Sequence, residues 1–373
     1  MIRVCHLTSV HPRYDGRIFR KECVSLFNAG YNVHLIVADG KGDEAVEGIN
    51  IIDVGTEVGR FSRILKTGRK VQRKAIDLNC DVYHFHDPEL IFTGLALKRK
   101  GKKVIFDMHE NVPGDIEEKA YLPILLRKVL SFFYKRLEIY TVKRIDGIVS
   151  TRESINERLS KYNKNIELIT NYPIIDKQIP KGVNNTPTIC FAGAVVQNWQ
   201  HKEIIKAIEP IKSISYHLAG TADDNYLKEL SILEGWRKVN YEGKVPFSKV
   251  KSIYQNGTIG VAIYVYCKNM DGNYGNLANT KLFEYMNWGL PIVCTDFTLW
   301  KEIVEDEINC GICVNPYDVN AITNAINYLI ENPDKAREMG ENGRKAVLSK
   351  YNWDILEKRL ILFYEQIIRE KKV

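Results

Sequence analysis

The sequence predicts an α/β protein made of two doubly wound parallel sheets. Three observations support this fold class: apolar strand-like segments alternate with helical segments in both halves, a polar Pro-containing stretch separates the halves, and 373 residues suffice for two or three domains. A hydrophobic fraction of 45% with 27% charged residues is ordinary for a globular chain and excludes a disordered one. Sheets of this type bind ligands beyond the carboxyl ends of their strands.

The N-terminal half, residues 1–170, shows the alternation first. Five apolar segments are predicted as strands, namely Arg3–Ser9, Asn32–Ala38, Asp81–Phe85, Lys103–Met108 and Gly147–Ser150. The segments between them are predicted as helices, namely Ile18–Ala29, Arg60–Leu78, Glu89–Lys100 and part of Val112–Lys143. This half is expected to form the first Rossmann-like domain.

Residues 171–187 carry three prolines among Asn, Lys and Gly and are predicted to be the linker. A second sheet is expected in residues 188–350, with strands at Thr188–Ala192, Ser215–Leu218, Val239–Tyr241, Ile259–Ile263, Ile292–Cys294 and Gly311–Val314. Residues 351–373 have a helical apolar periodicity. We expect this last helix to cross back to the N-terminal domain.

Cysteine spacing gives little reason to expect a metal. Eight cysteines are scattered along the chain, and only Cys310 and Cys313 are close together. A C-x-x-C pair without a second pair or a nearby His does not complete a zinc site, so buried free thiols are expected. Met1 leads straight into an apolar strand and no run of 18 uncharged apolar residues is present, so we expect a cytoplasmic protein without a signal peptide.

The formal net charge of +7 favours an anionic partner such as a nucleic acid, a membrane surface or a phosphorylated ligand. Residues 59–75 contain no acid and place Lys and Arg on one half of a helix and apolar residues on the other. Residues 121–144 mix large apolar residues with Lys and Arg. Basic amphipathic helices of this kind lie on anionic membranes, or else their apolar faces pack on the sheet and the charges are solvated.

The stretch from Asn276 to Cys294, NLANTKLFEYMNWGLPIVC, is expected to be a polar turn, a short helix and a buried strand. Lys281 in the first helical turn adds positive charge where backbone N–H groups are free to bind an anion. Glu284, at i+3 from this lysine, is placed to accept hydrogen bonds from hydroxyls such as those of a ribose. The alternative is an exposed salt bridge on an ordinary core helix.

Polar residues also follow the predicted strands of the N-terminal half. Gly16, in the loop HPRYDGR, would let a phosphate approach the backbone at a helix start. His84 lies near the end of another predicted strand, and His86 and Asp87 follow it. These residues are interpreted as substrate contacts, as hydrogen-bonding groups of the strand end, or as part of a metal site, for which further ligands at the usual spacings are absent. The next strand ends at His109, with Glu110 beside it.

The segment TKLFEYMNWGLPIV resembles the nucleotide-sugar motif of the retaining glycosyltransferases of family 4, and the resemblance extends over most of the chain. It implies the GT-B architecture, in which two Rossmann-like domains face one another across a cleft. By this resemblance Glu284 holds the donor ribose, Lys281 contacts the diphosphate, and His109 faces the transferred sugar and the acceptor. The further donor-binding residues it implies are Gly16, Gly193, Lys202, Val245, Asn276, Leu277, Ala278, Asn279 and Thr280, with His84, His86, Asp87 and Glu110 as acceptor contacts.

The chain departs from the family pattern at two positions. Ala194 follows Gly193 where many members have Arg, and Asn276 stands where many have the first of two glutamates. The resemblance implies a metal-independent hexosyltransferase without a cofactor, which uses a nucleotide diphosphate sugar and a glycan or lipid-linked acceptor. The basic helices at 59–75 and 121–144 favour a lipid-linked acceptor, as in bacterial surface polysaccharide assembly. Two alternatives are a nucleotide-sugar 2-epimerase of the same architecture and a non-catalytic basic module that binds nucleic acid, which the core spacing of most aromatics disfavours. No nucleic-acid partner is therefore expected.

Overall fold

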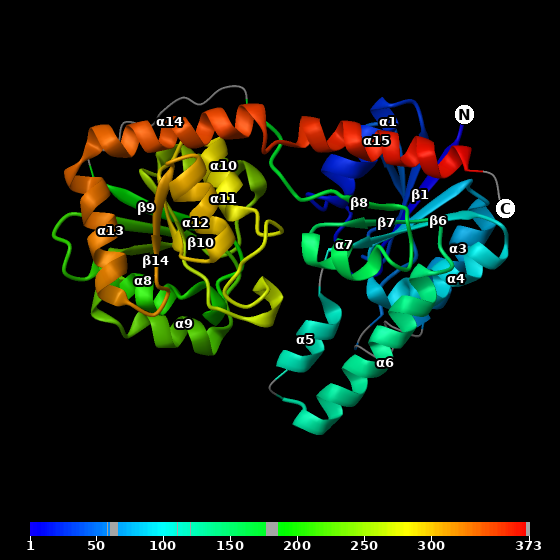
Figure 1. The fold of residues 1–373 in the computed structure, drawn as a ribbon, viewed down its shortest axis with the longest axis horizontal. Coiled ribbons are helices and arrows are strands. Elements are labelled where there is room, and N and C mark those ends of the chain that lie inside the picture. The colour runs from blue at the N-terminus through cyan, green and yellow to red at the C-terminus, as the bar shows by residue number, and fades with distance from the viewer. Residues whose placement is uncertain (58, 60–65, 110, 120, 177–185, 371–373) are drawn as a thin grey trace. The chain divides into compact units, whose positions relative to one another are not determined.

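The computed structural model describes residues 1–57, 59, 66–109, 111–119, 121–176 and 186–370 (Figure 1). The chain divides into two compact units. Met1–Asn171 and Trp353–Val373 form the N-terminal unit, and Tyr172–Asn352 form the C-terminal unit. Several predicted features lie wholly or partly outside the described residues, namely Glu110, residues 60–65 of the first basic stretch, residues 177–185 of the predicted linker and residues 371–373 of the last segment.

The N-terminal unit contains an eight-stranded sheet in the order β3-β4-β2-β1-β5-β6-β7-β8. Every neighbouring pair is parallel except the hairpin of β3 and β4. The strands are β1 (Arg3–Leu7), β2 (Asn32–Val37), β3 (Glu44–Val46), β4 (Ile49–Asp53), β5 (Val82–Phe85), β6 (Lys103–Met108), β7 (Gly147–Ser150) and β8 (Ile166–Leu168). The helices are η1 (Ile18–Cys23), α1 (Val24–Asn28), α3 (Gly68–Leu78), η3 (Pro88–Leu90), α4 (Ile91–Arg99), α5 (Val112–Glu118), α6 (Ile124–Val142), α7 (Glu153–Leu159) and α15 (Trp353–Arg369).

The C-terminal unit contains a six-stranded, fully parallel sheet in the order β11-β10-β9-β12-β13-β14. Its strands are β9 (Thr188–Ala192), β10 (Ser215–Ala219), β11 (Val239–Tyr241), β12 (Ile259–Ala262), β13 (Ile292–Thr295) and β14 (Gly311–Val314). Its helices are η4 (Gln197–Trp199), α8 (His201–Ile208), α9 (Asp224–Ser231), η5 (Glu234–Lys238), α10 (Phe247–Asn256), η6 (Lys268–Met270), α11 (Lys281–Asn287), α12 (Thr298–Lys301), η7 (Glu302–Glu307), α13 (Val319–Glu331) and α14 (Pro333–Ser349).

The prediction of two doubly wound sheets is confirmed, and each predicted strand is present within two residues of its expected ends. The strands that the sequence did not reveal are β3, β4 and β8, all of them five residues or shorter. In both sheets the strand order reverses beside the first strand, between β1 and β5 and between β9 and β12. Ligand sites of open α/β sheets form at such switch points.

The two basic segments differ in the structure. In α3 the side chains of Val71 and Ala75 are buried while those of Arg69 and Arg73 are exposed, so the apolar face of this helix packs on the protein. In α6 the large apolar side chains of the first half are exposed instead, among them Leu125 at 76% and Phe133 at 65%. The described helices include none that is long and apolar enough to cross a bilayer.

The cysteines are all free, as predicted. Cys310 is buried and Cys313 is partly buried, and Cys313 Sγ lies 3.6 Å from the Sγ of Cys294. Within the described part of the chain, the C-x-x-C pair contributes to no group of three or more metal-ligating side chains.

Candidate active site

The predicted pair in the C-terminal unit forms at the start of α11. Lys281 Nζ lies 2.6 Å from Glu284 Oε2, and the Oε1 of this glutamate accepts a hydrogen bond of 2.9 Å from the Thr280 hydroxyl. The hydroxyl of Tyr254 donates to Oε2 over 2.8 Å. Burial acts against ionisation of Glu284, but the ammonium of Lys281 and these hydrogen bonds lower the pKa of the carboxyl. The glutamate is therefore held as an anion in a fixed rotamer.

This pair lies at the switch point of the C-terminal sheet. A Cβ atom at Gly193, directly after β9, would lie 3.1 Å from Lys281 Cε and 3.1 Å from the ring of Phe191. The Lys281 ammonium stands 5.8 Å from the centroid of that ring. Glycine at position 193 therefore leaves the lysine beside the carboxyl end of β9, and the side chain of this lysine keeps 11% of its surface accessible.

Glycines allow close backbone contact between neighbouring loops on the same edge of the sheet. The N–H of Gly193 donates to the carbonyl of Ala219, and the N–H of Gly220 donates to the carbonyl of Gly243. A Cβ at Gly220 would lie 1.6 Å from the carbonyl oxygen of Gly193. The loops after β9, β10 and β11 thus approach one another through backbone atoms, a contact that a larger residue at Gly220 would prevent.

The turn before α11 is held by its own side chains. Asn276 is 5% exposed, donates to the carbonyl of Asn269 over 3.0 Å and accepts from the N–H of Ala278 over 3.1 Å. The N–H of Lys281 donates to Asn279 Oδ1 over 3.1 Å. The side chain of Asn276 therefore shapes the turn, and a role in sugar binding for this residue stays a prediction.

The other predicted donor-binding residues lie in loops or first helical turns of the same unit. Val245 follows β11 and is partly exposed, while Lys202 lies exposed in the first turn of α8. Leu277, Ala278, Asn279 and Thr280 are partly exposed in the turn before α11. Their contact with a donor is a prediction that the unliganded chain does not test.

In the N-terminal unit the loop after β1 is anchored on both sides of Gly16. Arg13 donates to Asp39 Oδ1 and Oδ2 and to Glu44 Oε1 over 2.6–2.8 Å. The carboxylate of Asp15 accepts from the N–H groups of Arg17 and Ile18 over 2.8 and 2.9 Å. The helix-start N–H groups that the sequence assigned to a phosphate are therefore capped by Asp15 in the unliganded chain. The backbone at Gly16 is exposed, and a Cβ there would meet no atom within 4 Å.

Asp87, at the end of β5, ties the loops after β1 and β5 together. Its Oδ2 accepts from the hydroxyl of Thr8 over 2.8 Å, and its Oδ1 lies 3.4 Å from His11 Nε2. The rings of His11 and His109 meet edge to face with centroids 5.2 Å apart. His109 keeps 18% of its side chain accessible, and its Nδ1 lies 3.5 Å from Asp107 Oδ2. His109 thus stands at the rim of this edge.

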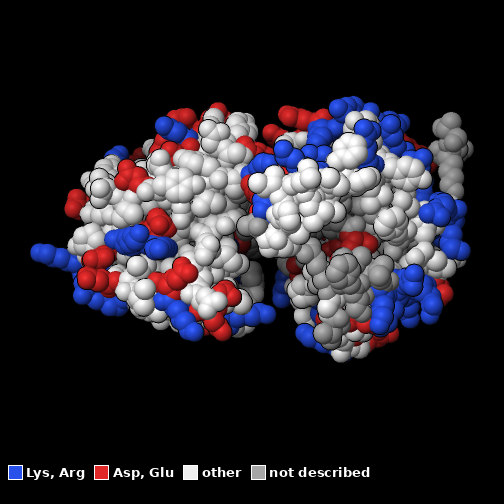
Figure 2. All heavy atoms as spheres, turned by 90° about the horizontal axis from the view of Figure 1, so that it is seen from below, with Lys and Arg blue, Asp and Glu red and all other residues white. Residues whose placement is uncertain are grey.

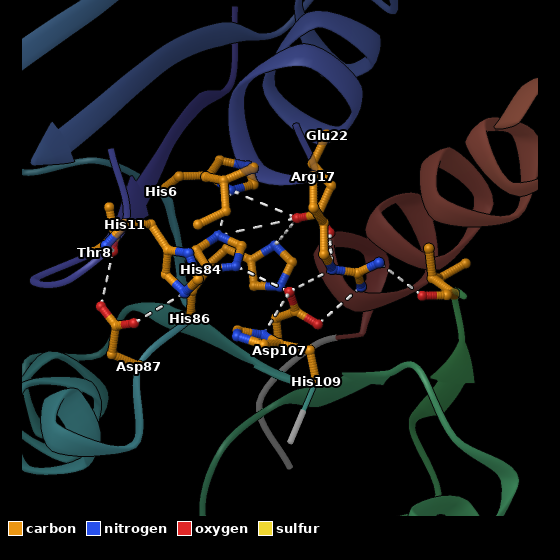
Figure 3. A network of polar contacts seen from close by, with 12 residues as sticks. His6, Thr8, His11, Arg17, Glu22, His84, His86, Asp87, Asp107 and His109 are labelled. Atoms are coloured by element: carbon orange, nitrogen blue, oxygen red, sulfur yellow. Dashed lines mark hydrogen bonds and ion pairs between the residues drawn. The ribbon is translucent and has the colours of Figure 1, made fainter. Parts of the chain in front are cut away.

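Behind this rim lies a buried charged network (Figure 3). Arg17 makes two hydrogen bonds of 2.8 Å to the carboxylate of Asp107, and its Nε stands 3.1 Å from Glu22 Oε1. Burial opposes ionisation of Asp107, but the guanidinium of Arg17 together with the neighbouring His109 and His86 outweighs it and holds the pKa of Asp107 well below its usual range. Burial raises the pKa of Glu22. The His86 Nδ1 lies 3.0 Å from Asp107 Oδ2.

Three histidines complete the network. His6, His84 and His86 are 0–1% exposed, and burial lowers the pKa of each, so the imidazoles are neutral. His84 Nδ1 lies 2.8 Å from the hydroxyl of Tyr364, which comes from α15. The side chains of His84 and His86 thus point into the unit, and the acceptor contacts predicted for them, for Asp87 and for Glu110 stay predictions.

A small pocket opens beside the network. Its walls are formed by residues that follow β5, by the last residues of β6 with the residue after it, and by α5 and α6, namely His86, Pro88, Phe106, Asp107, Met108, His109, Val112 and Tyr134. The pocket connects the predicted sugar-facing His109 with the buried Asp107. It is a candidate acceptor-side subsite of the N-terminal unit.

Sequence reasoning missed Arg17, Glu22, Asp107, Tyr254 and Tyr364, which hold the predicted residues in place. One signal was available, because Asp107 interrupts the apolar run that follows Lys103 in β6, and a fully buried carboxylate requires a partner. The identity of the partner could not be inferred from the sequence, since Arg17 lies 90 residues away from Asp107 along the chain.

Comparison with known families decides the class of protein. The family model described as Glycosyltransferase Family 4 matches residues 20–172, and the one described as Glycosyl transferases group 1 matches residues 174–346. The chain belongs to the group 1 glycosyltransferases. This glycosyltransferase is 26% identical over 305 residues to an uncharacterised glycosyltransferase of Methanocaldococcus jannaschii, which covers 76% of this chain and 73% of the relative.

A second relative matches only in part. Over 85 residues the glycosyltransferase is 29% identical to the MMP α-(1→4)-mannosyltransferase of Mycolicibacterium hassiacum, a match that covers 23% of this chain and 21% of the relative. The chain thus spans about a fifth of the length of that mannosyltransferase.

Solved structures show the fold of the glycosyltransferase to be GT-B. The sucrose-phosphate synthase of Thermosynechococcus elongatus superimposes with a TM-score of 0.78 at 16% identity, over 98% of this chain and 99% of the other. Anabaena HepE in complex with UDP and glucose gives 0.74 at 13% identity over 98% and 100%. WaaG, a glycosyltransferase involved in lipopolysaccharide biosynthesis, gives 0.71 at 14% identity over 97% and 99%.

Proposed function

We propose that this glycosyltransferase moves a hexose-type sugar from a nucleotide diphosphate sugar to a glycan or lipid-linked acceptor in bacterial surface polysaccharide assembly, with retention of the anomeric configuration. The observation that carries the proposal is the pair of Lys281 and Glu284 beside Gly193, at the switch point of the C-terminal sheet. Support for the donor class comes from a solved relative of the same fold, Anabaena HepE, which was crystallised with UDP-glucose.

The pair offers two groups of opposite character to a donor. The ammonium of Lys281 suits a diphosphate, and the carboxylate of Glu284 suits the hydroxyls of a ribose. In the unliganded chain the two groups bind each other over 2.6 Å, and Tyr254 and Thr280 hold the glutamate. Donor binding would replace this internal ion pair with one contact from each group, while the two hydroxyls keep Glu284 in position.

The transfer step would depend on the leaving group. Negative charge develops on the departing diphosphate, and a preorganised ammonium at Lys281 stabilises that charge more than it stabilises the bound donor. His109, at the rim of the N-terminal sheet, would orient hydroxyls of the transferred sugar and the acceptor. Asn276 cannot supply the carboxylate that many relatives carry there, so we favour a same-face substitution in which the leaving phosphate takes the acceptor proton. No metal takes part in this scheme.

We further propose that α6 brings the enzyme to an anionic membrane surface, which suits a lipid-linked acceptor and places the enzyme at the cytoplasmic face. Exposed apolar side chains gather at the start of this helix, namely Tyr121, Ile124, Leu125, Leu126, Val129, Leu130, Phe132 and Phe133. Figure 2 shows an uncharged surface on the N-terminal unit that is edged with Lys and Arg side chains. Such a patch combines apolar burial with attraction to anionic headgroups.

The donor is tested by a thermal-shift screen of the full chain against nucleoside diphosphates and nucleotide sugars. A ligand at 100 times its dissociation constant stabilises the folded chain by about 2.7 kcal/mol, which is readily measured. Proton NMR of the reaction with a binding donor then reports the anomeric configuration of the product. Formation of an epimer from donor alone would assign the chain to the 2-epimerases instead, and no shift with any nucleotide would reject the donor site.

Membrane docking is tested by sedimentation with vesicles. The chain is expected to bind vesicles that contain phosphatidylglycerol, and Leu125→Ser with Phe133→Ser is expected to weaken this binding by about tenfold or more, because burying one such side chain contributes about 1.5–3 kcal/mol. The matched control replaces Leu362, which is 63% exposed on α15, with Ser. Equal binding by the α6 variant and the control would reject α6 as the docking surface.

A further inference from the structure

Four side chains with metal-ligating atoms converge inside the N-terminal unit. His6 comes from β1, His84 from β5, His86 directly follows β5, and Glu22 comes from η1. One nitrogen or oxygen from each lies within 4.8 Å of the others, and all four residues are buried. Because β1 and β5 are parallel neighbours with His6 opposite His84, and His86 lies two residues on, the three imidazoles share one face of the sheet.

The carboxylate oxygen of Glu22 lies farther from the imidazole nitrogens than a hydrogen bond allows, while two of these nitrogens, His6 Nδ1 and His86 Nε2, lie 2.9 Å apart. Glu22 Oε2 stands 3.8 Å from His6 Nδ1, 3.6 Å from His84 Nδ1 and 3.9 Å from His86 Nε2. These separations are too long for hydrogen bonds, and Oε2 has no hydrogen-bond partner in the described structure. In a tetrahedral site with ligands about 2.0–2.2 Å from the ion, adjacent ligand atoms lie roughly 3.3–3.6 Å apart. The carboxylate oxygen is therefore placed as one corner of a cation cage. Coordination would replace the contact between His6 Nδ1 and His86 Nε2, because these two atoms would have to move apart from 2.9 Å to the spacing of adjacent ligands.

The surroundings orient these atoms toward one another (Figure 3). Asp107 holds His86 through Nδ1 over 3.0 Å, which leaves Nε2 directed at the cluster. A carboxylate behind a histidine is the usual outer partner of a metal-bound imidazole. The hydroxyl of Tyr364 lies 2.8 Å from His84 Nδ1 and 3.4 Å from His6 Nε2. Coordination through His84 Nδ1 would replace its hydrogen bond to this hydroxyl.

We propose that His6, Glu22, His84 and His86 form a structural site for a divalent transition-metal ion, with Zn²⁺ as the best match. Three imidazoles and one carboxylate form a donor set typical of zinc, and four protein ligands without solvent access characterise a structural site rather than a catalytic one. The ion would tie β1, β5 and η1 together beneath the loops that carry His11 and His109. The transfer reaction proposed above does not use it, and either proposal can fail without the other.

This site was not readable from the sequence, which predicted no metal. The pattern His84-x-His86 supplies only two ligands, and the other two come from positions 78 and 62 residues before His84, as the numbering shows. They join the pair only because β1 lies beside β5 and Glu22 of η1 reaches the histidines of both strands.

The first test measures metal in the tag-free full chain after dialysis against metal-free buffer. We expect zinc equimolar with protein, and a rise in Tm when zinc is returned to chelator-treated chain. Cobalt added to the chelator-treated chain is expected to give the visible absorption of a tetrahedral ion, with saturation at equimolar metal. Absence of all three signals from the unmodified chain would overturn the proposal and leave a network held by hydrogen bonds alone.

Variants locate the ion. Glu22→Gln and His84→Gln are each expected to weaken metal binding by at least about 10–100-fold, the loss that removal of even an outer partner causes. The matched control is His201→Gln, since His201 is also fully buried and also lies 2.8 Å from a tyrosine hydroxyl, that of Tyr216. Metal binding unchanged in both cluster variants would overturn the site. Should the variants fail to fold, the cobalt spectrum of the unmodified chain decides alone.

Discussion

The carboxyl edges of the two sheets follow the same topology but are filled in opposite ways. In the N-terminal unit the switch point beside β1 is occupied by buried histidines, Arg17 and Asp107, which satisfy one another away from water. In the C-terminal unit the switch point beside β9 holds Gly193 and one cation–carboxylate pair that remains partly accessible. The first edge is therefore internally paired, and the second holds the ion pair for which we propose exchange with a ligand.

The difference shows that position in a fold sets where a site can form, and that side chains set what it does. Charged groups in the first edge contribute through partners that are already in place, so removing one leaves another buried and unpaired. By the proposed function, Lys281 contributes mainly when a charged ligand replaces Glu284. Substitutions at the first edge should reduce stability, and those at the second should reduce turnover with stability preserved.

The largest expected effect is loss of stability in Asp107→Asn. The substitution leaves the buried guanidinium of Arg17 without its carboxylate, which costs about 3–5 kcal/mol of unfolding free energy. Urea denaturation followed by circular dichroism measures the change. The control Asp146→Asn removes a carboxylate whose lysine partners, Lys98 and Lys103, are partly exposed, and about 1 kcal/mol is expected there. Equal losses in the two variants would contradict the role of burial.

A large loss of turnover is expected for Lys281→Ala. Without the ammonium near the leaving diphosphate, kcat should fall about 10²–10³-fold while Tm stays close to that of the unmodified chain. The control Lys335→Ala breaks a pair of the same i, i+3 spacing, Lys335 with Glu338, in which both side chains are more than half exposed. That variant should keep its turnover. Near-normal rates in Lys281→Ala would remove the leaving-group role from this residue.

The stability of the C-terminal unit is expected to depend on pH through one buried histidine. Burial lowers the pKa of His201, in the C-terminal unit, to about 3. The unfolded chain binds this proton below about pH 6.5. Stability from the neutral His201 is therefore present above that pH and is lost toward pH 3 by about 1.4 kcal/mol per pH unit. Four of the five tryptophans, Trp199, Trp236, Trp288 and Trp300, lie in this unit, so tryptophan fluorescence follows its unfolding. His201→Gln should flatten the dependence, and an unchanged slope would refute the assignment.

The smallest expected effect comes from Gly193→Ala. The added methyl group would meet Lys281 Cε and the ring of Phe191 at 3.1 Å, so the lysine must shift, at a cost of about 1 kcal/mol. Nucleotide affinity measured by calorimetry should fall several-fold with little change in Tm. At Gly68, in α3, an added Cβ meets nothing within 4 Å, and Gly68→Ala should leave affinity unchanged and raise stability by about 0.5–1 kcal/mol. Unaltered affinity in Gly193→Ala would show that the lysine position is not limiting.

The sequence by itself determined the features that depend on local periodicity. Buried parallel strands such as β6 and β9 are short apolar runs bounded by polar loops, and Lys281 meets Glu284 because residues three apart are neighbours on a helix. The strands β3 (EAV), β4 (INIID) and β8 (IEL) were not predicted because each is short and contains an acidic residue, so none stands out as an apolar run.

Only the tertiary structure decided which distant residues share a site. Gly193 lies beside Lys281, Arg17 binds Asp107, and Tyr364 reaches His84 across 280 residues. These contacts depend on strand order and helix packing, and no spacing along the chain encodes them. The tertiary structure also decided which apolar faces are buried. The apolar face of α3 packs in the core and that of α6 is exposed, although the sequence of both segments is basic and amphipathic. The sequence shows which residues carry charge or hydrogen-bonding groups. The free energy that each group contributes depends on its partners and its exposure to water, and only the folded chain determines these.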